Sequence, residues 1–180
     1  NGATWLQDSA FAGGYALFFG GDDNLQADIP YTGDNWSIMI RVRAGDLGTS
    51  SPFYRAILDT STELSLVYGV SNKVWRLASG GGSNTDVSES QSDVENSERI
   101  LFAKSDSSDS QTTLEVYDGD KNPIGSSTTS GSESWTATTK YMGQWADGTR
   151  PWYGEIDPNL IWAERVVSDA TRDDWLSAYF

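Results

Sequence analysis

An alternation of side chains between positions 36 and 43 constrains the fold of this chain more than any other feature. The segment contains two interleaved sets of residues, one apolar and one mostly polar: Trp36, Ile38, Ile40 and Val42 in the first, and Ser37, Met39, Arg41 and Arg43 in the second. Successive side chains of a β-strand point to opposite faces. The spacing therefore predicts a strand with one apolar face and one wet face.

Further segments of the same kind follow along the chain, and turn residues separate them. Strand patterns or short apolar runs lie at 16–19, 64–70, 100–103 and 112–117. Clusters of Gly, Asp, Asn and Ser, which favour tight turns, lie at 20–24, 105–110 and 118–123. Many short strands punctuated by turns predict an all-β sandwich or barrel.

Residues 79–97 depart from this pattern. They contain Gly, Ser, Asp and Glu, with only Val87 and Val94 as apolar anchors. The stretch could serve as a linker between two domains, but neither half would then hold a complete set of strands. We therefore predict a single domain over residues 1–180 that carries a long mobile loop here.

Only the C-terminus has a helical pattern. Ser168 is a favourable N-cap and Asp169 suits the first turn of a helix. At helical spacing, Trp175, Leu176 and Tyr179 fall on one face. The sequence therefore predicts one short C-terminal helix.

Charge and composition exclude several classes of partner. The chain has 12 basic and 26 acidic residues, a net charge of −14, and such a surface repels nucleic acids and anionic membranes. The acidic side chains serve solubility, with cation binding by clustered carboxylates as the alternative. The chain contains no Cys and no His, so disulfides and zinc sites with the usual ligands are excluded. No apolar stretch approaches the length of a membrane span, and we expect no membrane insertion.

Four segments are similar to those of a known family and follow one another along the chain in the order of that family. The segment GEIDPNLIWAERVVSD at 154–169 resembles the closing strand of laminin G-like jelly rolls, in which a Gly-x-Ile-Asp strand runs into an aromatic residue and a Ser-led helical turn follows. The others are ALFFGGDDNL at 16–25, WSIMIRV at 36–42 and LEVYDGDK at 114–121. The resemblance implies a concanavalin A-like sandwich of two antiparallel sheets, one convex and one concave, with ligands on the concave face or at the loop rim.

The closing segment departs from the family pattern in two places. Asn159 stands where the family usually has an aliphatic residue, and Pro158 cannot donate a hydrogen bond to a sheet ladder. We expect this strand to carry a bulge or to lie at a sheet edge.

The same segment also bears on catalysis. Glu155, Asp157 and Asn159 share one face of a strand. Retaining glucanases of the superfamily carry Glu-x-Asp-x-Glu or Glu-x-Asp-x-x-Glu there, but Asn159 and Leu160 occupy the two candidate last positions, and an amide cannot act as the catalytic acid. Polysaccharide lyases of this fold usually use a His, which the chain lacks. We expect no catalytic activity, with a glycoside hydrolase or polysaccharide lyase as the remaining alternative.

One loop near the C-terminal end has the composition of a sugar-binding site. Flat aromatic rings stack on sugar rings, and neighbouring polar groups bind the hydroxyls. The loop supplies both kinds of group: Gln144, Trp145, Asp147, Arg150, Trp152 and Tyr153. The alternative interpretation is that Trp152 and Tyr153 begin the final strand and pack into the core.

The resemblance also implies a structural Ca²⁺, which sandwiches of this kind often hold between the opening loop and the closing strand. Ca²⁺ takes six to eight oxygen ligands. Asp157 matches the closing-strand aspartate and would bind together with carbonyls near Gly13, Gly14 and Phe18. Asp22 and Asp23 are a second candidate pair, and they could equally cap a turn.

These observations predict an extracellular or surface-exposed carbohydrate-binding or adhesion module without catalytic activity. Its partner would be a glycan or surface polysaccharide. The alternative is a structural or decoration protein of a virion or cell surface, whose partners would be other copies or other proteins of the assembly. Because the chain begins with Asn1-Gly2 and not with Met, we expect it to be a processed or excised piece.

Overall fold

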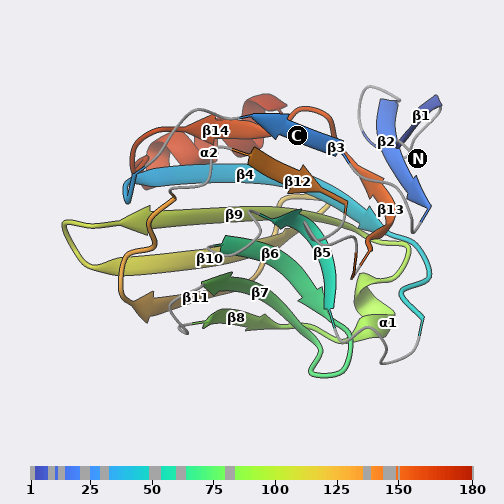
Figure 1. The fold of residues 1–180 in the computed structure, drawn as a ribbon, viewed down its shortest axis with the longest axis horizontal. Coiled ribbons are helices and arrows are strands. Elements are labelled where there is room, and N and C mark those ends of the chain that lie inside the picture. Colours follow the sequence, from blue (N-terminus) through green and yellow to red (C-terminus); the bar gives the residue numbers. More distant parts are fainter. Residues whose placement is uncertain are drawn as a thin grey trace.

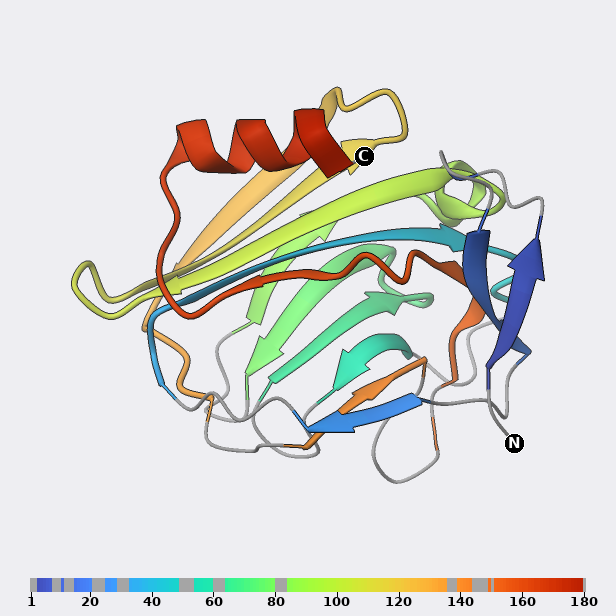
Figure 2. The ribbon, with the colours of Figure 1, turned by 90° about the horizontal axis from the view of Figure 1, so that it is seen from above.

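Antiparallel strands in two stacked layers dominate the structure (Figure 1). The computed structural model describes residues 3–7, 11, 15–20, 25–28, 33–48, 54–59, 64–79, 84–135, 139–143, 149 and 151–179. Within them the two sheets face each other, and a helix lies across the outer side of one sheet (Figure 2). The predicted all-β jelly-roll sandwich with a short C-terminal helix is confirmed.

In the described part of the chain the first layer, sheet A, has eight strands, and the second, sheet B, has six. The order in sheet A is β1 (Thr4–Gln7), β2 (Tyr15–Gly20), β13 (Tyr153–Ile156), β4 (Trp36–Ala44), β9 (Glu98–Asp106), β10 (Gln111–Asp118) and β11 (Pro123–Ser130), with β14 (Ile161–Ala163) paired to β4. The order in sheet B is β3 (Leu25–Asp28), β12 (Thr139–Met142), β5 (Tyr54–Asp59), β6 (Leu64–Gly69), β7 (Val74–Ser79) and β8 (Asn84–Ser88). The two helices of the described chain are α1 (Gln91–Val94) and α2 (Asp169–Tyr179).

The main core lies between the two sheets. Sheet A contributes the apolar set that alternation predicts, Trp36, Ile38, Ile40 and Val42, and sheet B contributes Leu66, Tyr68, Trp75 and Leu77. Full burial of one such side chain stabilises the fold by about 1.5–3 kcal/mol. The prediction that the apolar residues of this alternating segment face a core is therefore confirmed.

The predicted wet face of β4 is wrong, because a second core covers it. Met39 is fully buried there together with Ile100 and Phe102, beneath α2 and its residue Leu176. Ser37 is also buried, and its hydroxyl donates to the carbonyl of Arg165 at 3.0 Å. The outer side of β4 is thus covered at Ser37 and Met39, and the covering helix comes from the far end of the chain (Figure 2).

The stretch that was predicted to be a long mobile loop contains β8 and α1 instead. Val87 and Val94 are both buried in the main core. The carboxylate of Glu89, between the two elements, accepts hydrogen bonds from Trp75 Nε1 at 2.6 Å and from Arg99 Nε at 2.7 Å. Buried partners for a polar side chain thus order a segment whose composition alone resembles a loop.

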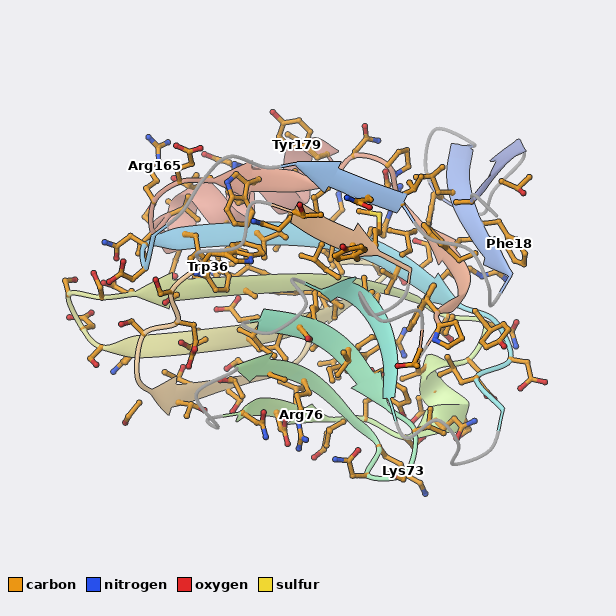
Figure 3. The ribbon with its side chains drawn as sticks, in the orientation of Figure 1. Phe18, Trp36, Lys73, Arg76, Arg165 and Tyr179 are labelled. Atoms are coloured by element: carbon orange, nitrogen blue, oxygen red, sulfur yellow. The ribbon has the colours of Figure 1, made fainter. Side chains whose placement is uncertain are left out.

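The C-terminal helix begins where the sequence predicts. The hydroxyl of Ser168 accepts a hydrogen bond from the amide of Thr171 at 3.2 Å, as an N-cap does. Leu176 is buried and Trp175 packs edge-on against Phe102, but Tyr179 is 57% exposed and points away from the sheets (Figure 3). No helix among the described residues is long and apolar enough to cross a membrane.

The closing segment forms two strands with a break at Pro158, and both pair with β4. β13 lies between β2 and β4, so it is not an edge strand. Gly154 in β13 has φ +139°, and a Cβ added there would lie 2.1 Å from the carbonyl oxygen of Arg43. This position therefore requires glycine, because the two backbones approach too closely for a side chain.

Candidate functional site

The sequence-predicted sugar loop is described only at its C-terminal end. Gln144, Trp145, Asp147 and Arg150 lie outside the described residues, as do the predicted metal ligands Asp22 and Asp23. Trp152 is 0% exposed, packs against Trp75 in the main core and presents no ring face to solvent. Tyr153, the first residue of β13, is half-buried. For Trp152 the interpretation that it packs inward is the correct one.

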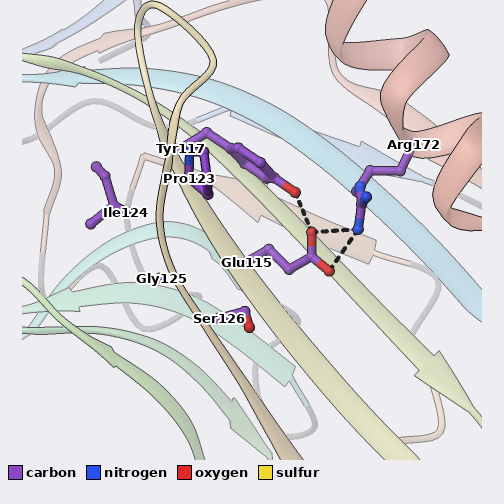
Figure 4. Close-up of a pocket in the computed structure, with 7 residues that line it drawn as sticks. All are labelled: Glu115, Tyr117, Pro123, Ile124, Gly125, Ser126 and Arg172. Carbon is purple, nitrogen blue, oxygen red and sulfur yellow. Dashed lines mark hydrogen bonds and ion pairs between the residues drawn. The ribbon is translucent and has the colours of Figure 1, made fainter.

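A different concave feature lies on the outer face of sheet A, between β11 and α2. One hollow of about 370 Å³ is lined by Glu115, Tyr117, Pro123, Ile124, Gly125, Ser126 and Arg172 (Figure 4). A second hollow of about 260 Å³ is lined by Lys104, Asp106, Asp109, Gln111, Thr113, Glu115, Ser126, Thr128 and Asp169. Because Glu115 and Ser126 line both, the hollows adjoin, and we call them together the outer groove.

The floor of the outer groove follows from the alternation along β10 and β11. Leu114 and Val116 of β10 are buried in the main core, so the residues between them point outward. The strand register pairs Glu115 with Ser126 and Thr113 with Thr128. Small side chains on β11 thus lie beside longer ones on β10, and this difference in size leaves the hollow.

A hairpin turn fixes one end of the groove. Asp118 ends β10, and its Oδ1 accepts hydrogen bonds from the amides of Asp120 and Asn122 at 2.9 and 2.8 Å. Lys121 has φ +69° in this turn. The turn brings Pro123 back beside Tyr117, where the register of the two strands shifts. This irregularity places Pro123 and exposed Ile124 at the apolar end of the groove.

A network of charged hydrogen bonds holds Glu115 at the junction of the two hollows. Arg172, which reaches down from α2, donates through Nη1 to both carboxylate oxygens of Glu115 at 3.0 Å (Figure 4). The hydroxyl of Tyr117 donates to Oε2 of the same carboxylate. Burial raises the pKa of Tyr117, and the hydrogen bond and charge of Glu115 raise it further. Tyr117 therefore stays a protonated donor, and the carboxylate keeps one orientation.

The groove carries more negative than positive groups. Its carboxylates are Asp106, Asp109, Glu115 and Asp169, and its cations are Lys104 and Arg172. Hydrogen bonds from the hydroxyl and amide of Ser108 lower the pKa of Asp106, which keeps this residue ionised. With the hydroxyls of Thr113, Ser126 and Thr128, the groove offers many acceptors and donors for a polar, uncharged ligand.

The two carboxylates of the closing segment, Glu155 and Asp157, form ion pairs with arginines of β4. Glu155 pairs with Arg43, with 3.1 Å between Oε1 and Nη1. Asp157, the predicted Ca²⁺ ligand, already binds a cation, the guanidinium of Arg41, at 2.5 Å. Among the described residues, no group of three or more Asp or Glu side chains is arranged to hold a metal ion. Gly13 and Gly14, near which carbonyl partners of Asp157 were predicted, lie outside the described residues, so the Ca²⁺ site stays a prediction.

Only part of the outer groove could have been predicted from the sequence. The alternation places Glu115 and Tyr117 on the outward face of one strand, but nothing local indicates that Arg172 meets them. The segment 123–130 could have indicated an unusual surface strand, because it has no charged residue in a strongly acidic chain.

No protein-family model matches this sequence, and no curated protein matches it either. Solved structures do. The fourth domain of AbnA, an extracellular GH43 arabinanase from Geobacillus stearothermophilus, in complex with arabinotriose, has a TM-score of 0.63 at 17% identity, over 97% of this chain and 81% of that one. Domains LG4-5 of the mouse laminin alpha1 chain give 0.59 at 17% identity, over 83% of this chain.

A third similar structure is the enzymatically active domain of bacteriophage CBA120 tailspike protein 2, with a TM-score of 0.62 at 10% identity over 97% of this chain. The chain spans 40% of the laminin structure and 28% of the tailspike structure. At these identities the likeness concerns the fold alone. The chain has the fold of the concanavalin A-like, laminin G-like jelly rolls.

Proposed function

We propose that this protein is a non-catalytic carbohydrate-binding module that acts outside the cell and binds a neutral glycan in the outer groove. The arabinanase domain of the same fold, which was solved with arabinotriose, supports a carbohydrate ligand. The outer groove itself carries the proposal, because it is a hollow lined by polar groups in fixed positions. The loop with Trp145 stays a separate prediction.

The dimensions of the groove suit a stretch of polysaccharide. Its floor extends along β10 from Gln111 to Tyr117, which corresponds to roughly 20 Å at the rise of a β-strand. A stretch of several sugar rings fits along this length. Pro123 and Ile124 supply an apolar surface at one end for the C–H face of a sugar ring.

The charges of the groove select against anionic glycans. The carboxylates accept hydrogen bonds from sugar hydroxyls, and Arg172 and Lys104 donate to ring and hydroxyl oxygens. A uronic acid or sulfate group would instead meet the excess of carboxylates, on a chain whose net charge is −14. The ligand class is therefore neutral polysaccharide.

Binding to a panel of soluble polysaccharides tests this proposal. The panel contains neutral members (arabinan, xylan and mixed-linkage β-glucan) and anionic members (polygalacturonate and alginate). Affinity electrophoresis and titration calorimetry measure binding, and a reducing-sugar assay on the same mixtures measures hydrolysis. We expect binding to at least one neutral member, none to the anionic members, and no release of sugar.

A matched pair of variants locates the site. Ser126→Tyr places a bulky ring on the floor where the two hollows meet, and we expect at least a tenfold loss of affinity. Ser88→Tyr makes the same change at an exposed position of β8 in sheet B and should bind like the unmodified protein. Equal binding by Ser126→Tyr and the unmodified protein would overturn the assignment to the groove, and absence of binding to every neutral member would overturn the function.

A further inference from the structure

Two arginines of β4 lie opposite two carboxylates of the closing segment. Arg41 and Arg43 are two residues apart on β4, and Glu155 and Asp157 are two residues apart at the end of β13. The register pairs Glu155 with Arg43, and the amide of Asp157 donates to the carbonyl of Arg41 at 2.9 Å. All four side chains therefore project from the same face of sheet A, and each carboxylate meets one guanidinium.

Both oxygens of the Asp157 carboxylate have protein partners, and Arg41 binds one of them. Arg41 donates to Oδ2 of Asp157 through Nε at 3.0 Å and through Nη2 at 2.5 Å. Oδ1 accepts a hydrogen bond from the amide of Asn159 at 2.8 Å. The side chains of Arg41 and Asp157 are only 3% and 1% exposed. Protein groups thus satisfy this carboxylate without a bound ion.

The remaining side of the guanidinium is also covered. The ring of Phe11 lies over Arg41, with 4.5 Å between the guanidinium carbon and the ring centroid. Phe11 is itself buried. A cation against an aromatic face in a dry environment is stabilised by the ring quadrupole. The carboxylate of Asp157 and the ring of Phe11 together bind the guanidinium, so the cation at this site is part of the chain.

We infer that Arg41 is the resident cation of Asp157, in the place of the Ca²⁺ that the family resemblance implies for this residue. Ca²⁺ requires six to eight oxygens at 2.3–2.6 Å, whereas Asp157 has both oxygens engaged. A divalent ion on this carboxylate would lie beside a guanidinium that stays protonated, and the buried position would screen their repulsion poorly. The closing segment is therefore fastened to β4 by an ion pair and does not need a metal at this position.

Thermal unfolding in calcium and in EDTA tests the inference with Asp157→Asn. The unmodified protein should have the same Tm in both buffers. Asp157→Asn should lower Tm by roughly 10 °C, because it removes the charge of the carboxylate from a buried guanidinium, and by the same amount in both buffers. A Tm of the unmodified protein that rises with calcium, and a rise that Asp157→Asn abolishes, would overturn the inference.

A double-mutant cycle in EDTA identifies the partner. If Arg41 is the cation of Asp157, Arg41→Gln combined with Asp157→Asn should be no less stable than Asp157→Asn alone, because the pair is already broken. If the two changes add in full, Asp157 has another partner and the inference fails. Arg43→Gln is the matched control, since its partner is Glu155, and its effect should add to that of Asp157→Asn. Should Arg41→Gln fail to fold alone, the calcium comparison with Asp157→Asn still decides.

Discussion

Replacing Glu89 by Gln should destabilise the protein far more than the same loss of charge at a surface pair. Glu89 joins β8 to α1, and its carboxylate accepts from Arg99 Nε at 2.7 Å and from Trp75 Nε1 at 2.6 Å. Arg99 and Glu89 are both buried, with side chains 9% and 5% exposed. Glu89→Gln keeps the size of the side chain but leaves the guanidinium without its counter-charge. Breaking a buried pair in this way costs about 3–5 kcal/mol.

The chain offers a matched control in the pair of Arg76 and Asp86. Arg76 donates to both carboxylate oxygens of Asp86, at 2.7 and 2.6 Å, but this pair lies on the outward side of sheet B and its side chains are 17% and 32% exposed. Exposed pairs contribute about 0–1 kcal/mol. Asp86→Asn should therefore lower the free energy of unfolding by less than about 1 kcal/mol.

Chemical denaturation monitored by Trp fluorescence measures both changes, because Trp75 contacts Glu89 directly. At about 2–4 °C per kcal/mol, Glu89→Gln should also lower Tm by roughly 10 °C. If it costs no more than Asp86→Asn, then the segment around β8 and α1 is not fastened by this pair. The interpretation that buried partners order this polar stretch would then be refuted.

Three further predictions concern the groove, the helix and the buried tyrosine. Glu115→Gln should weaken glycan binding about tenfold in calorimetry, because it removes a charge-assisted acceptor at the centre of the groove. Leu176→Ala should lower the free energy of unfolding by about 2–4 kcal/mol, since Leu176 of α2 is buried in the second core, whereas Tyr179→Ala at an exposed position should change it by less than about 0.5 kcal/mol. Burial and Glu115 raise the pKa of Tyr117 in the folded state, so its contribution to stability is complete below the unfolded value of about 10 and is lost as the pH rises above it. Denaturation between pH 8 and 11 should show this loss, and Tyr117→Phe should reduce its slope.

The alternation in the sequence predicts the inward face of β4 because that face is buried in the main core between the two sheets. Ile38, Ile40 and Val42 needed no knowledge of distant segments to be assigned to a core. The opposite face could not be predicted in this way, since the cover of Met39 is α2, which lies more than a hundred residues later in the chain. A period of two reports which residues share a face and does not report what covers it.

The prediction of a mobile loop around Glu89 was wrong for a related reason, because the partners of its polar residues are distant in the sequence. The stretch around Glu89 has few apolar residues, but Arg99 and Trp75 supply buried partners that only the folded sheets bring near. Trp152 has the same side chain whether it stacks on a sugar or fills a core, and the composition of its loop could not separate the two. The outer groove depends on the strand register and on the approach of α2, and both are long-range features.

Chemical-shift mapping by NMR during titration with a neutral oligosaccharide tests the proposed site most directly. Binding in the outer groove predicts that the amide signals that change most belong to β10, β11 and the first turns of α2, with Glu115, Ser126 and Arg172 among them. Changes concentrated on sheet B, or in the loop that carries Trp145, would contradict the proposed site.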